Sequence, residues 1–138
     1  MPSNPRGNLP ARDSLRSPRA LSEHERKIAE WILRNGKSPQ RDAMLAQLKE
    51  ARVIRQCPCG CDSVDFLIPS TGEPKEIALT MLGDYFYDSQ DAGLCGIFVF
   101  AKGEILGGIE VYSFGDTPAR LPKSSQLRPA EFPDDTSR

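Results

Sequence analysis

Three cysteines at alternate positions are the residues of this sequence whose type and spacing most clearly permit chemistry. Cys57, Cys59 and Cys61 are separated only by a proline and a glycine. Alternate side chains of an extended strand point to the same side, so the three thiols are expected to lie together. Three thiolates in that arrangement can ligate zinc at about 2.3 Å if a fourth ligand is supplied. The residues that could supply it are Cys95, His24 and Asp62.

A metal site is nevertheless not the favoured interpretation of this cluster. Structural zinc usually binds to Cys-x-x-Cys pairs, and the sequence contains none. Pro58 and Gly60 are also expected to bend the segment away from a regular strand. We therefore expect small, partly buried cysteines at a tight turn, with no bound metal or other cofactor. Metal binding through the three thiols is the alternative, and thiol redox chemistry is a third interpretation.

A segment rich in both aromatic and acidic residues, 84–91, is the second candidate site. The Gly83-Asp84 dipeptide that introduces it is a turn signal, so the sequence predicts a loop between strands. Aromatic side chains supply binding energy at interfaces, and carboxylates attract a basic partner. The residues predicted to contact such a partner are Asp84, Tyr85, Tyr87, Asp88 and Asp91. The alternative is a solvated loop whose aromatic residues anchor it to the sheet.

Groups suited to catalysis are sparse. His24 is the single histidine, and it falls in the first turn of a predicted helix, where side chains are usually solvated. Asp65, Glu110 and Tyr112 are predicted to share one face of a sheet, and paired carboxylates can do acid–base work only when a pocket brings them together. Most side chains on such faces are solvated. The sequence therefore predicts that the protein is not an enzyme, and a hydrolase built on Asp65 and Glu110 is the least favoured function.

Two helices are expected where the ordered chain begins. Ser22 and Glu25 form a capping-box pattern, and apolar residues then recur at helical spacing as far as Asn35. Ser38-Pro39 is a second start signal, in which a capping residue precedes a proline at the first helical position. An amphipathic stretch follows it and ends near Ala51.

The rest of the core sequence predicts strands. A first hairpin spans 53–68 around the cysteine turn, and a second pairs 94–101 with 104–113. The apolar run at 77–82 is too short to reveal its period, so it is left open as a further strand or a helical turn. The predicted fold class is α+β, with two N-terminal helices packed on one face of a four- or five-stranded antiparallel sheet built from hairpins.

The two ends of the chain differ in composition from its centre. Residues 1–20 carry four arginines against one aspartate and few apolar groups, which predicts a disordered basic arm. Recurring prolines in 119–138 predict an irregular tail. Residues 21–118 remain as a single α+β domain with a net charge of −5, and this acidic body disfavours nucleic acid as a partner.

The location expected from the sequence is cytoplasmic, away from membranes. No apolar stretch approaches the roughly 20 residues needed to span a bilayer. The N-terminus also lacks the apolar core of a signal peptide. In a reducing compartment the cysteines are expected to be thiols or metal ligands.

The sequence resembles a family of small, functionally uncharacterised bacterial proteins over residues 21–127. Its most specific feature is the hairpin at 55–66, which contains a Cys-x-Cys-Gly-Cys-x-Ser-x-Asp motif. A two-helix start, a late strand pair at 103–112 and a Gly-Asp-x-Pro turn at 115–118 accompany it. The late strand pair is also similar to parts of bacterial immunity proteins that neutralise secreted toxins. The resemblance implies a stand-alone bacterial domain and brings no catalytic residues.

The function expected from these observations is a non-enzymatic module that binds another protein. The acidic body indicates a basic partner, and the similarity to immunity proteins implies toxin neutralisation as its specific form. The sequence indicates no oligomeric state.

Overall fold

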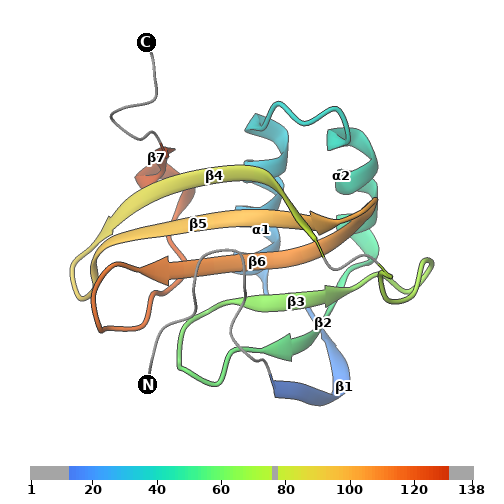
Figure 1. The fold of residues 1–138 in the computed structure, drawn as a ribbon, viewed down its shortest axis with the longest axis horizontal. Coiled ribbons are helices and arrows are strands. Elements are labelled where there is room, and N and C mark those ends of the chain that lie inside the picture. Colours follow the sequence, from blue (N-terminus) through green and yellow to red (C-terminus); the bar gives the residue numbers. More distant parts are fainter. Residues whose placement is uncertain (1–12, 76–77, 131–138) are drawn as a thin grey trace.

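A twisted antiparallel sheet with both helices on one of its faces forms the frame of the molecule (Figure 1). The computed structural model describes residues 13–75 and 78–130. In chain order the elements are β1 (Asp13–Ala20), α1 (Glu23–Asn35), α2 (Arg41–Glu50), β2 (Arg52–Gln56), β3 (Val64–Leu67), β4 (Leu79–Ser89), β5 (Gly93–Lys102), β6 (Ile105–Ser113), the 3-10 turn η1 (Ser124–Gln126) and β7 (Arg128–Pro129). The sheet order is β1-β2-β3-β6-β5-β4-β7. The predicted α+β class is confirmed, but the described residues form seven strands, whereas four or five were predicted.

The first helix begins at the capping box that the sequence predicted. The Glu25 amide donates to Ser22 Oγ (3.0 Å), and the Ser22 amide donates back to the Glu25 carboxylate (2.8 Å). These bonds satisfy amides that have no partner within the helix. The buried face of α1 carries Ile28 and Ile32. Helix α2 begins at Arg41, later than Ser38-Pro39 indicated, and buries Met44 and Leu48.

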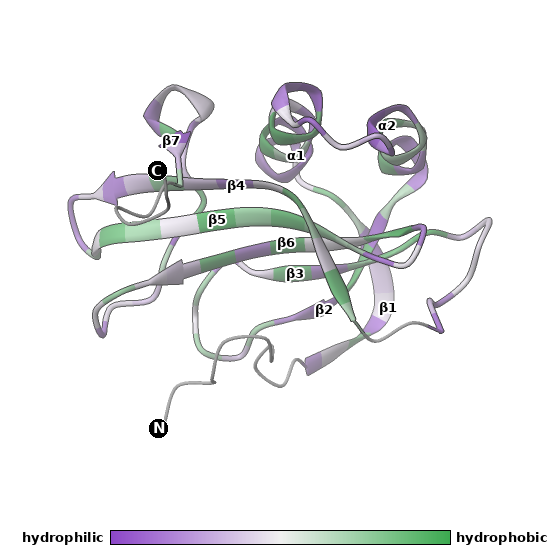
Figure 2. Ribbon diagram, turned by 45° about the horizontal axis from the view of Figure 1, so that its top comes forward, coloured by the Kyte–Doolittle hydropathy of each residue, from purple (hydrophilic) through white to green (hydrophobic). Residues whose placement is uncertain are grey.

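Both predicted hairpins are present, as β2–β3 and β5–β6. Strand β5 lies near the middle of the sheet, and its unbroken apolar sequence reflects burial on both faces. Ile97 and Val99 pair with Val111 and Ile109 of β6, and Ile109 also pairs with Val64 of β3. These residues belong to the same buried cluster as the apolar residues of α1 and α2. Figure 2 shows the apolar sequence of β5 as a largely green strand.

Aromatic residues occupy the face of the sheet that points away from the helices. Phe98 and Phe100 alternate with the helix-facing residues of β5, and their rings meet edge to face with centroids 6.1 Å apart. Tyr112 continues the row toward Phe114 with a centroid distance of 5.5 Å, and Phe114 contacts Phe86 at 5.9 Å. Such tilted pairs stabilise the packing beyond the area that they bury.

The segment 84–91 was predicted to be a loop, and this is wrong for most of its length. Residues 84–89 belong to β4, which pairs with β5 from Leu79↔Lys102 to Ser89↔Gly93. The register shifts between Met81 and Gly83, so the glycine that suggested a turn marks a β-bulge inside a long strand. Gln90, Asp91 and Ala92 form the turn that follows β4.

The predicted disordered arm is also corrected, because residues 13–20 form strand β1 at the edge of the sheet. Arg19 anchors this polar segment to α1 and β2 through its side chain. Its guanidinium binds both carboxylate oxygens of Glu25 (3.0 and 2.9 Å) and the side-chain oxygen of Gln56. Backbone pairing with β2 adds Asp13↔Gln56 and Ala20↔Arg52. Residues 1–12, the remainder of the predicted arm, lie outside the described residues.

The ion pair between Arg19 of β1 and Glu25 of α1 predicts that the free energy of unfolding will fall at acid pH. Burial alone would raise the pKa of Glu25, but hydrogen bonds from Arg19 and Ser22 more than compensate, and the net pKa is lowered. The stabilisation is therefore complete above the unfolded pKa near 4.5 and is lost as the pH falls through the lower folded value. At neutral pH, Glu25→Gln should lower the free energy of unfolding by about 1–3 kcal/mol. Denaturant melts across the pH range should show this difference shrinking below pH 4.5.

Glu23→Gln is the matched control for that experiment. Glu23 lies on the same helix and pairs with Lys27 (3.1 Å), but both side chains are mostly exposed. Exposed pairs of this kind contribute little, so its effect should stay below about 0.5 kcal/mol. Equal effects of the two substitutions would contradict the assignment of Arg19–Glu25 as a structural pair.

The predicted irregular tail, 119–138, is partly regular. Within its described part, η1 is followed by β7, which pairs with β4 through Phe86↔Arg128 and Tyr85↔Pro129. A proline can take this place because β7 is an edge strand and its outer side needs no amide donor. Residues 131–138 lie outside the described residues.

Candidate functional site: the three-cysteine loop

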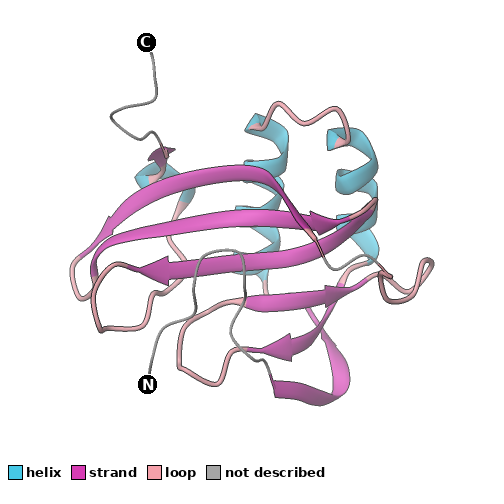
Figure 3. Cartoon of the chain, viewed as in Figure 1, coloured by secondary structure: helices cyan, strands magenta, loops and turns pink. Residues whose placement is uncertain are grey.

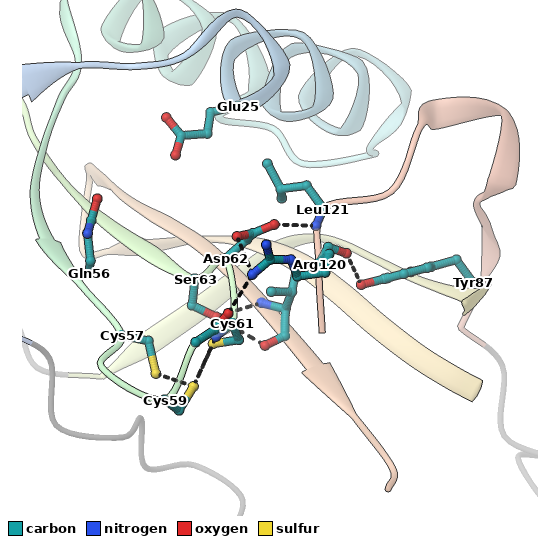
Figure 4. Close-up of polar contacts among 12 residues, drawn as sticks. Glu25, Gln56, Cys57, Cys59, Cys61, Asp62, Ser63, Tyr87, Arg120 and Leu121 are labelled. Atoms are coloured by element: carbon teal, nitrogen blue, oxygen red, sulfur yellow. Dashed lines mark hydrogen bonds and ion pairs between the residues drawn. The ribbon is translucent and has the colours of Figure 1, made fainter. Parts of the chain in front are cut away.

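The three thiols converge in the connection between β2 and β3, a segment that Figure 3 shows as a loop. Their sulfur atoms all lie within 4.8 Å of one another. Cys59 Sγ is 2.7 Å from Cys57 Sγ and 3.0 Å from Cys61 Sγ (Figure 4). The loop turns at Gly60, whose φ of 99° favours glycine. The sequence predicted convergence through strand alternation, but a turn produces it.

The three cysteines differ in their access to solvent. Cys57 is buried with 7% of its surface exposed, Cys61 is half-buried, and Cys59 is exposed. The central sulfur of the cluster is therefore also the one that solvent and solutes reach first. A reactive or metal-binding thiol needs this kind of access, whereas cysteines that are only packing residues are usually buried.

Ser63 fixes the inner end of the loop. Its hydroxyl accepts from the Val111 amide (2.9 Å) and donates to the Val111 carbonyl (3.1 Å). The side chain thereby takes the place of a backbone ladder pair between the start of β3 and the end of β6. The Cys57 amide then donates to the Ser63 carbonyl (3.3 Å) and closes the loop on itself. Ser63 is 1% exposed, so these bonds are shielded from water.

The outer side of the loop is held by residues 119–121. The Asp62 amide donates to the Ala119 carbonyl (3.1 Å), and the Leu121 amide donates to the Asp62 carboxylate (2.8 Å). Arg120 extends its guanidinium to the Gly60 carbonyl (2.8 Å). The hydroxyl of Tyr87 in β4 donates a hydrogen bond to the Arg120 carbonyl (2.6 Å). This bond ties residues 119–121, here called the strap, to the sheet. The loop is therefore positioned from both sides (Figure 4).

The three thiols differ in the direction in which their pKa values are shifted. Burial and the hydrogen bond with Cys59 raise the pKa of Cys57 to about 12, and burial also raises the pKa of Cys61. Burial alone would raise the pKa of Cys59, but hydrogen bonds from both neighbouring thiols and from the Cys61 amide lower it overall. The first proton to leave the cluster therefore comes from Cys59, and its thiolate is stabilised by the other two thiols.

The chain places no other thiol or imidazole beside this cluster. It contains four cysteines and one histidine, and all five lie within the described residues. Cys95 is fully buried on β5, next to Tyr87. His24 Nε2 is 2.8 Å from the Pro122 carbonyl, and the Asp62 carboxylate is bound by the Leu121 amide. The described residues thus offer the cluster three soft ligands and leave its exposed side open.

The five residues predicted to contact a partner do not form one surface. Tyr87 is 2% exposed, and burial raises its pKa. Tyr85 packs its ring edge to face on Trp31 of α1, with centroids 5.3 Å apart. Both tyrosines therefore point toward the helices, which contradicts their predicted role as exposed anchors. Alternation along a strand does put them on one side, as predicted, but that side is the core.

The three aspartates of that prediction have different surroundings. Asp84 is half-buried, its Oδ1 is the one buried side-chain oxygen in the described part of the chain without a hydrogen-bond partner, and burial raises its pKa. Asp88 is exposed and pairs with Arg128 of β7 (2.8 Å). Asp91 lies in the turn after β4 and is exposed. Asp88 and Asp91 are thus the members of the set that a partner can reach.

The predicted carboxylate pair lies on the face of the sheet away from the helices. Asp65 forms an ion pair with Arg55 (3.3 Å), and its backbone pairs with Gly108. Glu110 lies two residues further along β6 and is 8% exposed. Tyr112 follows on the same face, with its ring 6.2 Å from that of Phe98. Asp65 and Glu110, the two predicted acid–base residues, therefore lie on a face of the sheet that carries the Arg55–Asp65 ion pair and the aromatic rings of Phe98 and Tyr112.

Sequence reasoning identified the thiols but missed the groups that position them. Ser63 lies in the hairpin motif, yet nothing local indicates that its hydroxyl would reach a strand 48 positions away. Arg120 lies in a proline-rich segment that the sequence predicted to be irregular.

Comparison with models of known families, with curated proteins and with solved structures found no match. In the described part of the chain, no helix has the length and apolar character needed to cross a membrane.

Proposed function

We propose that the protein binds a thiophilic metal ion through Cys57, Cys59 and Cys61. The observation that carries this proposal is the convergence of three sulfur atoms within 4.8 Å on a loop held from both sides. Thiolates at about 2.3 Å from a shared ion would be about 4 Å apart in a planar trigonal site. The two short separations, 2.7 and 3.0 Å, must therefore open by about 1 Å, a change that side-chain rotation can provide.

The donor set favours soft ions. Thiolate ligands select Cu(I) and zinc over hard cations such as magnesium or calcium. Zinc usually takes four ligands, so it would need a further donor from solvent or another molecule at the exposed side. Cu(I) accepts lower coordination numbers, and three thiolates suffice for it. The sequence ranked metal binding below simple packing of the cysteines, and the proposal reverses that order because the loop is anchored by distant residues and its central thiol is exposed.

Titration of the reduced protein with Cu(I) and with Zn(II) tests this proposal. One equivalent of at least one ion should bind, with a thiolate-to-metal absorption band for copper. Cys59→Ser should weaken binding by at least about 100-fold, since one of three charged donors is lost. Cys95→Ser is the matched control and should bind as the wild type does, because Cys95 is buried elsewhere.

The affinity for the ion should also fall as the pH falls. Binding must displace protons from thiols, and two of the three have raised pKa values. No stoichiometric binding of either ion, or equal losses in the Cys59 and Cys95 variants, would reject the site.

Binding of a basic protein remains a second candidate function. It is supported by two exposed apolar side chains at one end of the sheet, Leu94 (38% exposed) and Phe114 (56% exposed). They are neighbours, since the Phe114 amide donates to the Leu94 carbonyl (3.1 Å). Asp88 pairs with Leu94 across the ladder, and Asp91 lies in the adjoining turn. An apolar contact bordered by carboxylates suits a basic partner, of which a secreted toxin would be one form.

A further inference from the structure

We propose that the three-cysteine loop is also a redox modification site, at which a hydroperoxide converts Cys59 and one flanking cysteine into a disulfide. Disulfide formation itself is independent of the proposed metal binding. The consequence for a bound ion, loss of the ligand set, rests on the proposed function.

The central position of Cys59 makes it the obligatory member of any such disulfide. Its sulfur is 2.7 Å from Cys57 Sγ and 3.0 Å from Cys61 Sγ. A disulfide bond is about 2.05 Å long, so either pair needs to close by only about 0.7–1 Å. Cys59 is also the exposed member, so a small oxidant reaches it before Cys57 or Cys61. Cys95 is fully buried and should not react.

The chemistry balances with one hydroperoxide per disulfide. The Cys59 thiolate attacks one peroxide oxygen, so an S–O bond forms and the O–O bond breaks. The oxygen that leaves takes up a proton as water when the oxidant is hydrogen peroxide. The flanking thiol then attacks the sulfenic sulfur of Cys59, so the S–S bond forms and the S–O bond breaks. The hydroxide that leaves takes the proton of that thiol as a second water, and the two sulfurs have supplied the two electrons.

Oxidation and metal binding would exclude each other. A disulfide consumes two of the three donors, and the single remaining thiol cannot retain the ion. Reduction by a dithiol would restore all three. The loop can support both states because Ser63 and residues 119–121 hold its backbone, so that only the cysteine side chains need to change rotamer.

The test uses the full chain, reduced and free of metal, with one equivalent of hydrogen peroxide. Of the four thiols, two should be lost, with a mass decrease of about 2 Da and recovery after dithiothreitol. Cys57→Ser and Cys61→Ser should each still form a disulfide, because one neighbour of Cys59 remains. Cys59→Ser should lose thiols at least about 10-fold more slowly, and Cys95→Ser should behave as the wild type. Circular dichroism establishes that each variant is folded.

Two further measurements keep the inference open to refutation. Peptide mapping of the oxidised wild type must find Cys59 in the disulfide, and a Cys57–Cys61 disulfide or an over-oxidised Cys59 would overturn the proposal even if a variant misfolds. Release of Cu(I) from loaded protein, measured with a chromophoric chelator, should follow disulfide formation. If the disulfide forms but no ion binds to reduced protein, only the proposed function fails. If an ion binds but no disulfide forms, only this inference fails.

Discussion

Gly108→Ala is expected to lower the free energy of unfolding by about 4 kcal/mol or more, a loss that few single substitutions cause. Gly108 has a φ of 151°, which L side chains rarely adopt. A β-carbon there would lie 2.2 Å from the Val64 carbonyl oxygen and 3.1 Å from Asp65 Cα. These atoms are backbone of the neighbouring strand, so the clash can be relieved only by separating β3 from β6. Urea denaturation followed by circular dichroism measures the loss.

Gly115→Ala is the matched control for this substitution. A β-carbon at Gly115 meets no heavy atom of the described residues within 4 Å, and Gly115 follows the end of β6. Its effect should stay within about 0.5 kcal/mol. A Gly108→Ala protein of near wild-type stability would show that β3 and β6 are less closely paired than described. Because Ser63 precedes Val64, a displaced β3 should also weaken ion binding by the cysteine loop.

Tyr87→Ala is expected to cost about 3–5 kcal/mol of stability, the range found for removing a large buried aromatic side chain. Tyr87 is 2% exposed and belongs to the buried hydrophobic cluster of the described residues. Its hydroxyl also donates to the Arg120 carbonyl (2.6 Å), so truncation leaves a cavity and removes the donor of a part-buried hydrogen bond. Thermal and denaturant melts should report the loss, and the strap at 119–121 should become more susceptible to proteolysis.

Two milder substitutions separate the contribution of the Tyr87 hydroxyl from that of burying the Tyr87 ring. Tyr87→Phe removes only the hydroxyl and should cost about 0.5–1.5 kcal/mol. Tyr85→Ala should cost less than Tyr87→Ala, since Tyr85 is half-buried and its main ring contact is Trp31. If Tyr87→Ala left stability unchanged while a binding activity disappeared, Tyr87 would be a surface anchor after all. The geometry predicts the opposite outcome.

Local signals in the sequence were sufficient for the first helix and for both hairpins. The capping box at Ser22 and Glu25 depends on residues three positions apart, so it can be recognised without tertiary information. Each hairpin pairs two strands that are neighbours in the chain, and glycine marks the connection between them. The α+β class follows from these elements alone.

The segment 84–89 shows how a local signal can mislead. Gly83-Asp84 has the composition of a turn, but pairing along the whole of β5 makes the glycine a bulge. The long-range ladder then sets the directions of Tyr85 and Tyr87, and burial converts predicted contact residues into core residues. Edge strands β1 and β7 were missed for a similar reason. Neither carries an apolar pattern, and each is ordered by pairing with a strand distant in the sequence.

The residue types and their spacing were readable without a structure: three thiols within five residues and a single histidine. The convergence of the thiols was expected, but the tertiary structure shows that a turn at Gly60 produces it and that Cys59 is the exposed member. Their meeting depends on a hydroxyl that binds a strand 48 residues away and on a strap about 60 residues downstream that holds Asp62 and Gly60. Such contacts are set by the packing of the whole sheet, and no local pattern encodes them. The same packing placed Cys95 and His24 elsewhere, so that among the described residues the cluster has three sulfur ligands.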